Sequence, residues 1–274
     1  MYDSLGTIGS LADLGVLLLH GLQILIACSV RCYALFLVLP ATADASFKGV
    51  VRNGIVLCLG TYIAWGQQFD LITQLQPVTI VLLLGKELLL GLLLGYAASV
   101  VFWIAEGVGV LIDNQAGFNN VQQTNPLSGE QNTPVSNMLS QLAICGFYML
   151  GGMVVLAGML FESFKWWPLT SVSPMWPSIL EDFIRVYTGR YLESVVKVAA
   201  PIVLVLILVD VGIGLLSKTA EKLDPNSLAQ PIKGTVALAM LAILVIVFFD
   251  QVRPALSLQT LAQELSSWSQ ALRR

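Results

Sequence analysis

The sequence predicts an all-α, polytopic membrane protein, and three observations lead to this fold class. Of the 274 residues, 56% are hydrophobic and only 11% are charged, whereas about 25% of the residues of a soluble domain carry a charge. The mean hydropathy is +0.79. The apolar residues come in long runs and do not alternate with polar ones as in a half-buried strand. Such a chain needs lipid, or a large apolar partner, around its surface.

Six apolar segments are candidates for helices that enter or cross a bilayer, which requires about 20 mostly apolar residues. The second segment is shorter than this. The third is much longer and would extend roughly 50 Å as one helix, against about 30 Å for the hydrocarbon core. It either projects from the membrane or is broken into two helices, such as a hairpin, and Gly91, Gly95, Gly107 and Gly109 make both options possible. The segments are residues 14–39, 50–65, 78–112, 135–164, 195–216 and 235–249.

The connections between these segments differ in character. Residues 113–134 are polar, rich in Asn and Gln, and contain no Lys or Arg. Residues 165–192 contain several tryptophans and prolines, which suit a membrane interface. Residues 218–233 are charged and include the turn signal Asp224-Pro225-Asn226.

The C-terminal tail has the pattern of an amphipathic helix. Leu261, Leu265, Trp268 and Leu272 recur at helical spacing. We therefore expect residues 255–274 to form a helix that lies on a membrane or a partner. The chain as a whole, residues 1–274, is interpreted as a single membrane domain.

The positive charges do not define one topology for six simple spans. Lys and Arg are frequent in residues 165–197 and again in residues 218–233, although connections on opposite sides of the membrane should differ in positive charge. Some segments are therefore expected to pack inside an assembly instead of crossing lipid. A cleavable signal peptide is not indicated, because the first basic residue, Arg31, lies within the first apolar segment.

Several charged residues lie in or beside the apolar segments, where an unpaired charge is costly. They are Arg31, Lys86, Glu87, Asp210 and Lys233. A proton or ion relay would use such groups. We favour the alternative, in which they are buried charges that pair within the chain or across a subunit interface.

Small residues and one proline indicate close packing and a kink. Gly91 and Gly95, with Ala98 continuing the small face, allow another helix backbone to approach closely. Pro201 removes a backbone hydrogen bond from the fifth segment and is expected to kink it. His20 is the only histidine, and we interpret it as a packed residue.

No arrangement of residues indicates catalysis or a cofactor. The four cysteines, Cys28, Cys32, Cys58 and Cys145, all lie in apolar segments, where packing is favoured over a disulfide or a metal site. The chain lacks the common hydrolase, metalloprotease and nucleotide-binding motifs. We therefore predict a non-enzyme without metal or cofactor.

Short motifs recur in order along most of the chain. They are Gly85-Lys86-Glu87, Gly91, Gly95, Gly107, residues 112–117, Asn125-Pro126-Leu127, Ala200-Pro201, Asp210, Gly214, Asp224-Pro225-Asn226 and Gln230-Pro231-Ile232-Lys233. This series resembles the FliR/SctT family, the export-gate subunits of bacterial type III secretion in flagella and injectisomes. Residues 162–168 resemble the injectisome branch, although a tyrosine is more usual there at Phe164.

The resemblance implies an assembly and a location. Family members join small hydrophobic subunits of the FliP/SctR and FliQ/SctS families, and a FlhB/SctU-like switch protein is a further expected partner. The complex forms a helical pore in the bacterial inner membrane, partly raised toward the periplasm, through which unfolded secreted proteins pass. No nucleic acid is involved.

By position, residues 113–134 match the loop that plugs the pore in this family. Phe118 and Val121 could then fill a constriction. Uncharged amides can line such a plug because their desolvation costs less than that of ions. The amide residues of this candidate plug are Gln115, Asn119, Asn120, Gln122 and Gln123.

Two other functions were weighed against an export-gate subunit. A secondary transporter or channel for a small solute would act alone, but no internal repeat typical of transporters is visible. An intramembrane enzyme would need a nucleophile and a base, and neither is apparent. Activity of the isolated chain in liposomes would distinguish a transporter from a gate subunit.

Overall fold

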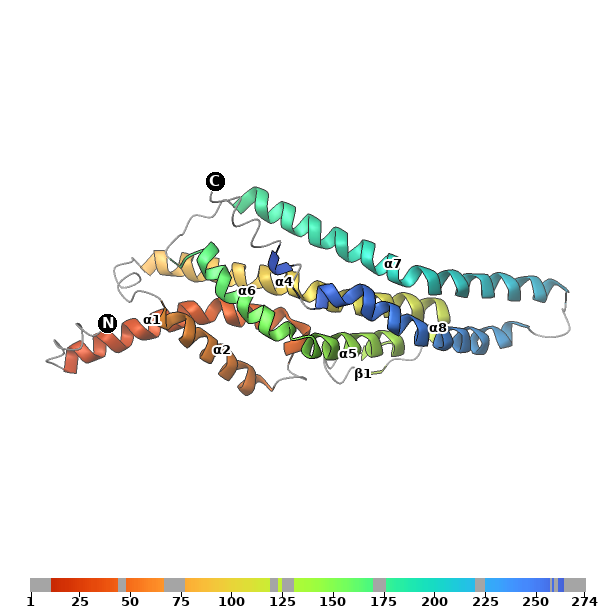
Figure 1. Cartoon of the computed structure of the whole chain (residues 1–274), viewed down its shortest axis with the longest axis horizontal. Coiled ribbons are helices and arrows are strands. Elements are labelled where there is room, and N and C mark those ends of the chain that lie inside the picture. The colour runs from red at the N-terminus through yellow and green to blue at the C-terminus, as the bar shows by residue number, and fades with distance from the viewer. Residues whose placement is uncertain are drawn as a thin grey trace. The chain divides into compact units, whose positions relative to one another are not determined.

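The computed structural model describes residues 11–43, 48–66, 77–118, 123–124, 131–169, 176–219, 225–256, 258 and 261–263. The described chain is almost entirely helical (Figure 1), which confirms the predicted all-α class. Its helices are α1 (Leu11–Val38), the 3-10 turn η2 (Pro40–Thr42), α2 (Gly49–Trp65), α4 (Pro77–Ala116), α5 (Pro134–Met149), α6 (Gly152–Trp166), α7 (Trp176–Thr219) and α8 (Pro225–Leu256). The two-residue strands β1 (Gln123–Thr124) and β2 (Gln131–Asn132) pair antiparallel.

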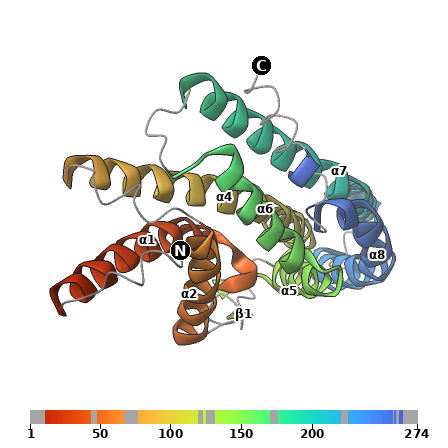
Figure 2. The same cartoon turned by 60° about the vertical axis from the view of Figure 1, so that its left-hand side comes forward.

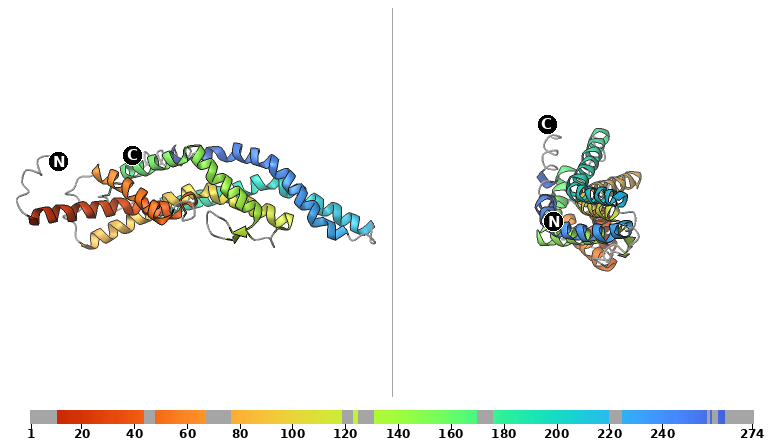
Figure 3. Two further views of the ribbon diagram at one scale, coloured as in Figure 1. Left: turned by 90° about the horizontal axis from the view of Figure 1, so that it is seen from below. Right: turned by 90° about the vertical axis from the view of Figure 1, so that its right-hand side faces the viewer.

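The chain forms two compact units. Unit 1 comprises residues 1–96 and 158–175, and unit 2 comprises residues 97–157 and 176–274. Helices α4 and α6 each begin in one unit and end in the other. In unit 1, α2 packs against α1 (Figure 2). In unit 2, α7 and α8 form an antiparallel hairpin (Figure 3).

Helix α1 ends where a proline stops it. Pro40 opens the single turn η2, because proline fits the first position of a helix but cannot continue one. The Thr42 hydroxyl then donates to the carbonyl oxygens of Phe36, at 2.7 Å, and Leu39, at 3.0 Å. The bond to Phe36 satisfies a carbonyl in the last turn of α1, where helical partners are lacking, whereas the Leu39 carbonyl also accepts from the Thr42 backbone N–H. The first two predicted segments, 14–39 and 50–65, agree closely with α1 and α2.

Helix α4 resolves the two possibilities for the third segment. It is one continuous helix of 40 residues, which corresponds to about 60 Å at the helical rise. The alternative of a hairpin at its glycines is therefore wrong. The helix also continues through residues 113–116, so the candidate plug starts with a helical turn instead of a loop.

The predicted single segment 135–164 is a broken pair of helices. Helices α5 and α6 meet at an angle of 70°. Gly151 has a φ of +73° at the break, a left-handed conformation that glycine adopts readily and that commonly ends a helix. The sequence pattern missed the break because both sides of it are equally apolar.

Helices α7 and α8 are longer than the predicted segments 195–216 and 235–249. Residues 176–194 form the first part of α7, not an irregular interfacial connection, because a charged stretch can be helical without forming an apolar run. Pro201 lies inside α7, which continues past it. Of the predicted tail helix 255–274, only residues 255, 256, 258 and 261–263 are described, and Leu258 has a φ of +53°.

Among the described residues, three helices are long and apolar enough to cross a membrane. They comprise Gly15–Val38, Val78–Ala116 and Ile184–Lys218, and the bent α5–α6 pair would make a fourth. The segments of α2 and α8 are apolar but shorter. The chain is thus a polytopic membrane protein in which the six predicted segments do not all have the length of a span.

Candidate functional site

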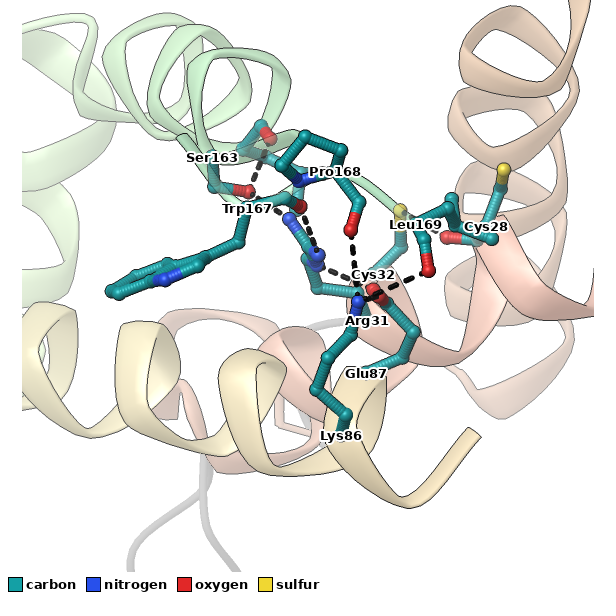
Figure 4. A network of polar contacts seen from close by, with 10 residues as sticks. Cys28, Arg31, Cys32, Lys86, Glu87, Ser163, Trp167, Pro168 and Leu169 are labelled. Atoms are coloured by element: carbon teal, nitrogen blue, oxygen red, sulfur yellow. Dashed lines mark hydrogen bonds and ion pairs between the residues drawn. The ribbon is translucent and has the colours of Figure 1, made fainter. Parts of the chain in front are cut away.

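Arg31 lies at the centre of a buried polar network in unit 1 (Figure 4), and its whole side chain is inaccessible to solvent. Its Nε donates to Glu87 Oε2 at 2.6 Å. Its Nη1 donates to the Ser163 hydroxyl at 2.9 Å, and its Nη2 donates to the Trp167 carbonyl oxygen at 3.0 Å. The guanidinium carbon also lies 3.9 Å from the centre of the Phe164 ring. The network therefore ties α1 to α4 and to the end of α6.

Lys86 extends this network from α4. Its Nζ lies 2.9 Å from Glu87 Oε1. It also donates to the carbonyl oxygens of Pro168, at 2.9 Å, and Leu169, at 3.2 Å. Pro168 and Leu169 follow the end of α6 at Trp166, and the negative ends of their carbonyl dipoles suit a cation.

In the described part of the chain, the ion pairs of this network join two cations to one carboxylate. Glu87 is fully buried and contacts both Arg31 and Lys86. The excess positive charge is offset by backbone carbonyls of residues 167–169. Removing one member of a buried ion pair costs about 3–5 kcal/mol, because the remaining charge is left uncompensated. This arrangement suits a rigid joint between helices and leaves the charges little freedom to act as a relay.

Two glycines bring α4 against α1 beside this network. A Cβ atom at Gly91 would collide with the Arg31 carbonyl oxygen and the Ala34 side chain. A Cβ at Gly95 would lie 3.0 Å from the Leu35 carbonyl oxygen. The small residues predicted on this face of α4 thus let the α4 and α1 backbones pack closely, so that Arg31 and Glu87 can form their ion pair.

In unit 2, Asp113 near the end of α4 caps the N-terminus of α5. Its Oδ2 accepts hydrogen bonds from the backbone N–H groups of Val135, at 3.0 Å, and Ser136, at 3.1 Å. The N-cap residue of α5, Thr133, makes no capping bond with its side chain. Asp113 supplies the missing acceptor, and its negative charge is favourable at the positive end of the helix.

The opposite face of the last turn of α4 contacts α7 and α8. Gln115 donates from Nε2 to Asp210 Oδ2 on α7 at 3.0 Å. The other carboxylate oxygen, Asp210 Oδ1, forms an ion pair with Lys233 on α8. The Lys233 and Asp210 side chains are 18% and 36% exposed, so this cluster is partly hydrated, unlike the network around Arg31.

Two further contacts hold the residues that follow α4. Gly117 has a φ of +83° and ends the helix. Gln230 of α8 donates from Nε2 to the Gly117 carbonyl oxygen at 3.0 Å. The Phe118 ring lies over Gly234 of α8, where a Cβ atom would be 3.1 Å from the ring Cζ.

The predicted site residues thus fall into two groups. Arg31, Lys86 and Glu87 belong to the network of unit 1, whereas Gln115, Phe118, Asp210 and Lys233 meet in unit 2. Gln123 lies in β1, and Pro201 is exposed on α7. The predicted plug residues Asn119, Asn120, Val121 and Gln122 lie outside the described residues.

Several residues that contribute to these sites are not among those predicted from the sequence. Ser163, Trp167 and Pro168 lie in the stretch 162–168 that resembles the injectisome branch, and Leu169 follows this stretch, but none of them is among the predicted site residues. Gln230 lies in the motif 230–233 and Gly234 follows it, but only Lys233 of this motif is among the predicted site residues. The polar residues of these motifs were the available signal, but their partners are far away in the chain.

The family described as bacterial export proteins, family 1, matches residues 22–258. The chain belongs to this family. The FliR/SctT resemblance is thereby confirmed, because the match covers most of the chain and includes both groups of site residues.

Individual relatives agree with this assignment. The chain is 33% identical to Yop proteins translocation protein T of Yersinia pestis over 214 residues, which cover 78% of this chain and 82% of the relative. It is 26% identical to surface presentation of antigens protein SpaR of Salmonella typhimurium, over 87% of this chain and 88% of the relative. It is 25% identical to flagellar biosynthetic protein FliR of Bacillus subtilis, over 84% and 88%. The higher identity to the Yop translocation protein than to the flagellar protein agrees with the predicted injectisome branch.

Proposed function

We propose that this chain is a non-enzymatic, pore-forming subunit of a type III secretion export apparatus in the bacterial inner membrane. In this role it helps to form and to gate the entry channel for unfolded substrate proteins. Its partners are subunits of the FliP/SctR and FliQ/SctS families, together with a FlhB/SctU-like protein. Membership of the bacterial export family is the observation that carries this proposal.

The surface of α7 supports a role inside an assembly. Large apolar side chains are exposed along this helix, among them Val196, Leu204, Leu208, Val211 and Leu215, each more than half exposed. An apolar face of this extent requires lipid or partner helices. The long helix α4 has the same implication, because about 60 Å of helix exceeds one bilayer core.

The gating role is proposed for the polar loop within residues 113–134. Its support lies in the way both ends of the loop are anchored within unit 2. Asp113 binds the start of α5, and Gln115 and Gly117 bind α7 and α8. In a loop with fixed ends, the middle can fill a constriction and be displaced by a passing chain while both ends stay attached.

The export complex reconstituted in planar bilayers tests this function. Replacing residues 119–130 by a short Gly-Ser linker should increase the resting ion conductance of the fully assembled complex. Phe118→Ala should have the same effect to a smaller degree. An assembled complex with the shortened loop that conducts ions no better than the wild type would refute the gating role.

A matched control keeps the length of the loop and its uncharged amide side chains, and changes only the size of two of these side chains. The double variant Asn119→Gln and Asn120→Gln keeps uncharged amides at both positions and should remain closed. Native mass spectrometry of each preparation should find one copy of this chain together with several copies of the partner subunits. A chain that stays monomeric in the presence of these partners would contradict the proposed assembly.

A further inference from the structure

The last turn of α4 is held from two opposite faces. Asp113 and Gln115 are two residues apart, which corresponds to roughly 200° around a helix. Asp113 therefore contacts the N-terminus of α5, whereas Gln115 contacts Asp210 on α7. The two attachments differ in kind, and this difference has consequences for how the segment can move.

The attachment through Asp113 is buried and involves backbone groups. The Asp113 side chain is fully buried and accepts from two N–H groups of α5. Releasing this carboxylate would leave a buried charge and two helix N–H groups without partners, which is costly. This attachment is therefore expected to persist whenever the chain is folded.

The attachment through Gln115 is partly hydrated, and it depends on the side chains of Gln115, Asp210, Lys233 and Gln230. Gln115 binds Asp210, which in turn pairs with the partly exposed Lys233. Gln230 uses its side-chain amide to bind the Gly117 carbonyl oxygen. Water can replace each of these bonds at little cost, and no helical backbone bond has to break.

Phe118 depends on this second attachment for its position. Its ring is seated on α8 at Gly234, where the absence of a side chain leaves room for it. Phe118 directly follows Gly117, whose carbonyl is bound by Gln230. If the bonds Gln115–Asp210 and Gln230–Gly117 were lost, the Phe118 ring could move away from Gly234 while Asp113 still caps α5.

We propose that the α7–α8 hairpin is a releasable latch for the end of α4. Asp210, Lys233 and Gln230 are positioning residues that keep Phe118 against Gly234 in the closed channel. Opening breaks the contacts of Gln115 and Gly117 and leaves the Asp113 cap intact. This inference rests on the proposed gating role of the loop and adds the residues that set its closed state.

The resting conductance of the assembled complex in planar bilayers tests the latch. Asp210→Asn and Lys233→Gln should each increase this conductance several-fold, because the ion pair that holds Gln115 is weakened. The exchange Asp210→Lys with Lys233→Asp should return it to near the wild-type value, since Gln115 can turn its amide oxygen toward the new ammonium group. Gly234→Ala removes no charge, yet it should also raise the conductance by displacing the Phe118 ring.

The control is Glu193→Gln, which removes a carboxylate from an exposed ion pair with Lys197 on the same helix. It should leave the conductance unchanged. The latch, but not the gating role, would be overturned if the Asp210→Asn complex assembles normally and stays closed while the complex with the shortened loop leaks ions. A charge exchange that leaks as much as the single variants, or an Asp210→Asn chain that no longer assembles, would also overturn the latch, because either would assign Asp210 a purely structural role. A closed complex with the shortened loop would instead refute the gating role.

Discussion

Replacing Glu87 by glutamine is the most direct test of the charge network in unit 1. The substitution keeps the size of the side chain but removes the carboxylate that pairs with both Arg31 and Lys86. Arg31 and Glu87 are fully buried, so solvent cannot replace the lost charge. The expected loss in unfolding free energy is about 3–5 kcal/mol, the typical cost of breaking a buried ion pair.

The charge balance predicts a rank order among the variants of this network. Among the described residues, the ion pairs of the wild-type network join Arg31 and Lys86 to Glu87, which gives these three side chains a net charge of +1. Lys86→Met leaves the balanced pair of Arg31 and Glu87, so it should destabilise the protein less than Glu87→Gln. The double variant should lose less stability than the sum of the two single losses, because only Arg31 is then left without an anion.

Unfolding of the purified protein in mixed detergent micelles measures these differences. Glu162→Gln is the matched control, because Glu162 forms an ion pair with Lys165 on the exposed surface of α6. Exposed pairs contribute little, so this variant should unfold like the wild type. A Glu87→Gln protein within about 1 kcal/mol of the wild type, or a Lys86→Met protein less stable than Glu87→Gln, would refute the reasoning from buried charge.

Three further substitutions test other parts of the fold. Gly91→Ala should strongly reduce stability in the same micelle assay, because the new Cβ would collide with α1. Gly85→Ala is the control: its Cβ meets nothing within 4 Å, so it should be neutral or stabilising by up to about 1 kcal/mol. Equal effects of the two substitutions would contradict the close packing of α4 against α1. Asp113→Ala should cost about 1–2 kcal/mol through loss of the α5 cap, with a smaller loss for Asp113→Asn, and faster hydrogen exchange of the Val135 amide would report it. Gly151→Ala should cost about 1–2 kcal/mol because φ is +73° there, and unchanged thermal stability would speak against a strained turn.

The residues of the charge network could be predicted from the sequence, but their partners could not. Arg31, Lys86 and Glu87 are conspicuous as charges in apolar segments, where burial demands compensation. The sequence does not say what compensates them, because Ser163 is 132 residues away from Arg31. The acceptors at residues 167–169 are backbone carbonyls, which carry no signature in the amino-acid sequence.

The residues at the start of the polar loop, next to the end of α4, could likewise be predicted from the sequence, but their contacts could not. The sequence shows a polar loop without Lys or Arg, and it indicates Phe118 as a side chain that could fill a constriction. The contacts that hold its base come from α5, α7 and α8. Gln230 and Gly234 become site residues only because α8 folds back along α7, which places them beside Gly117 and Phe118.

The sequence by itself determined the class of this protein, its family and the identity of its buried charges. Composition and long apolar runs are sufficient for the class, because lipid accepts helices of almost any apolar sequence. The family follows from the order of the short motifs, and the buried charges follow from their positions in apolar segments. Only the tertiary structure decided that α4 is unbroken, that Gly151 separates α5 from α6, and which groups compensate Arg31, Glu87 and Asp210. These features depend on a single backbone conformation or on contacts between residues far apart in the chain, and neither leaves a periodic pattern in the sequence.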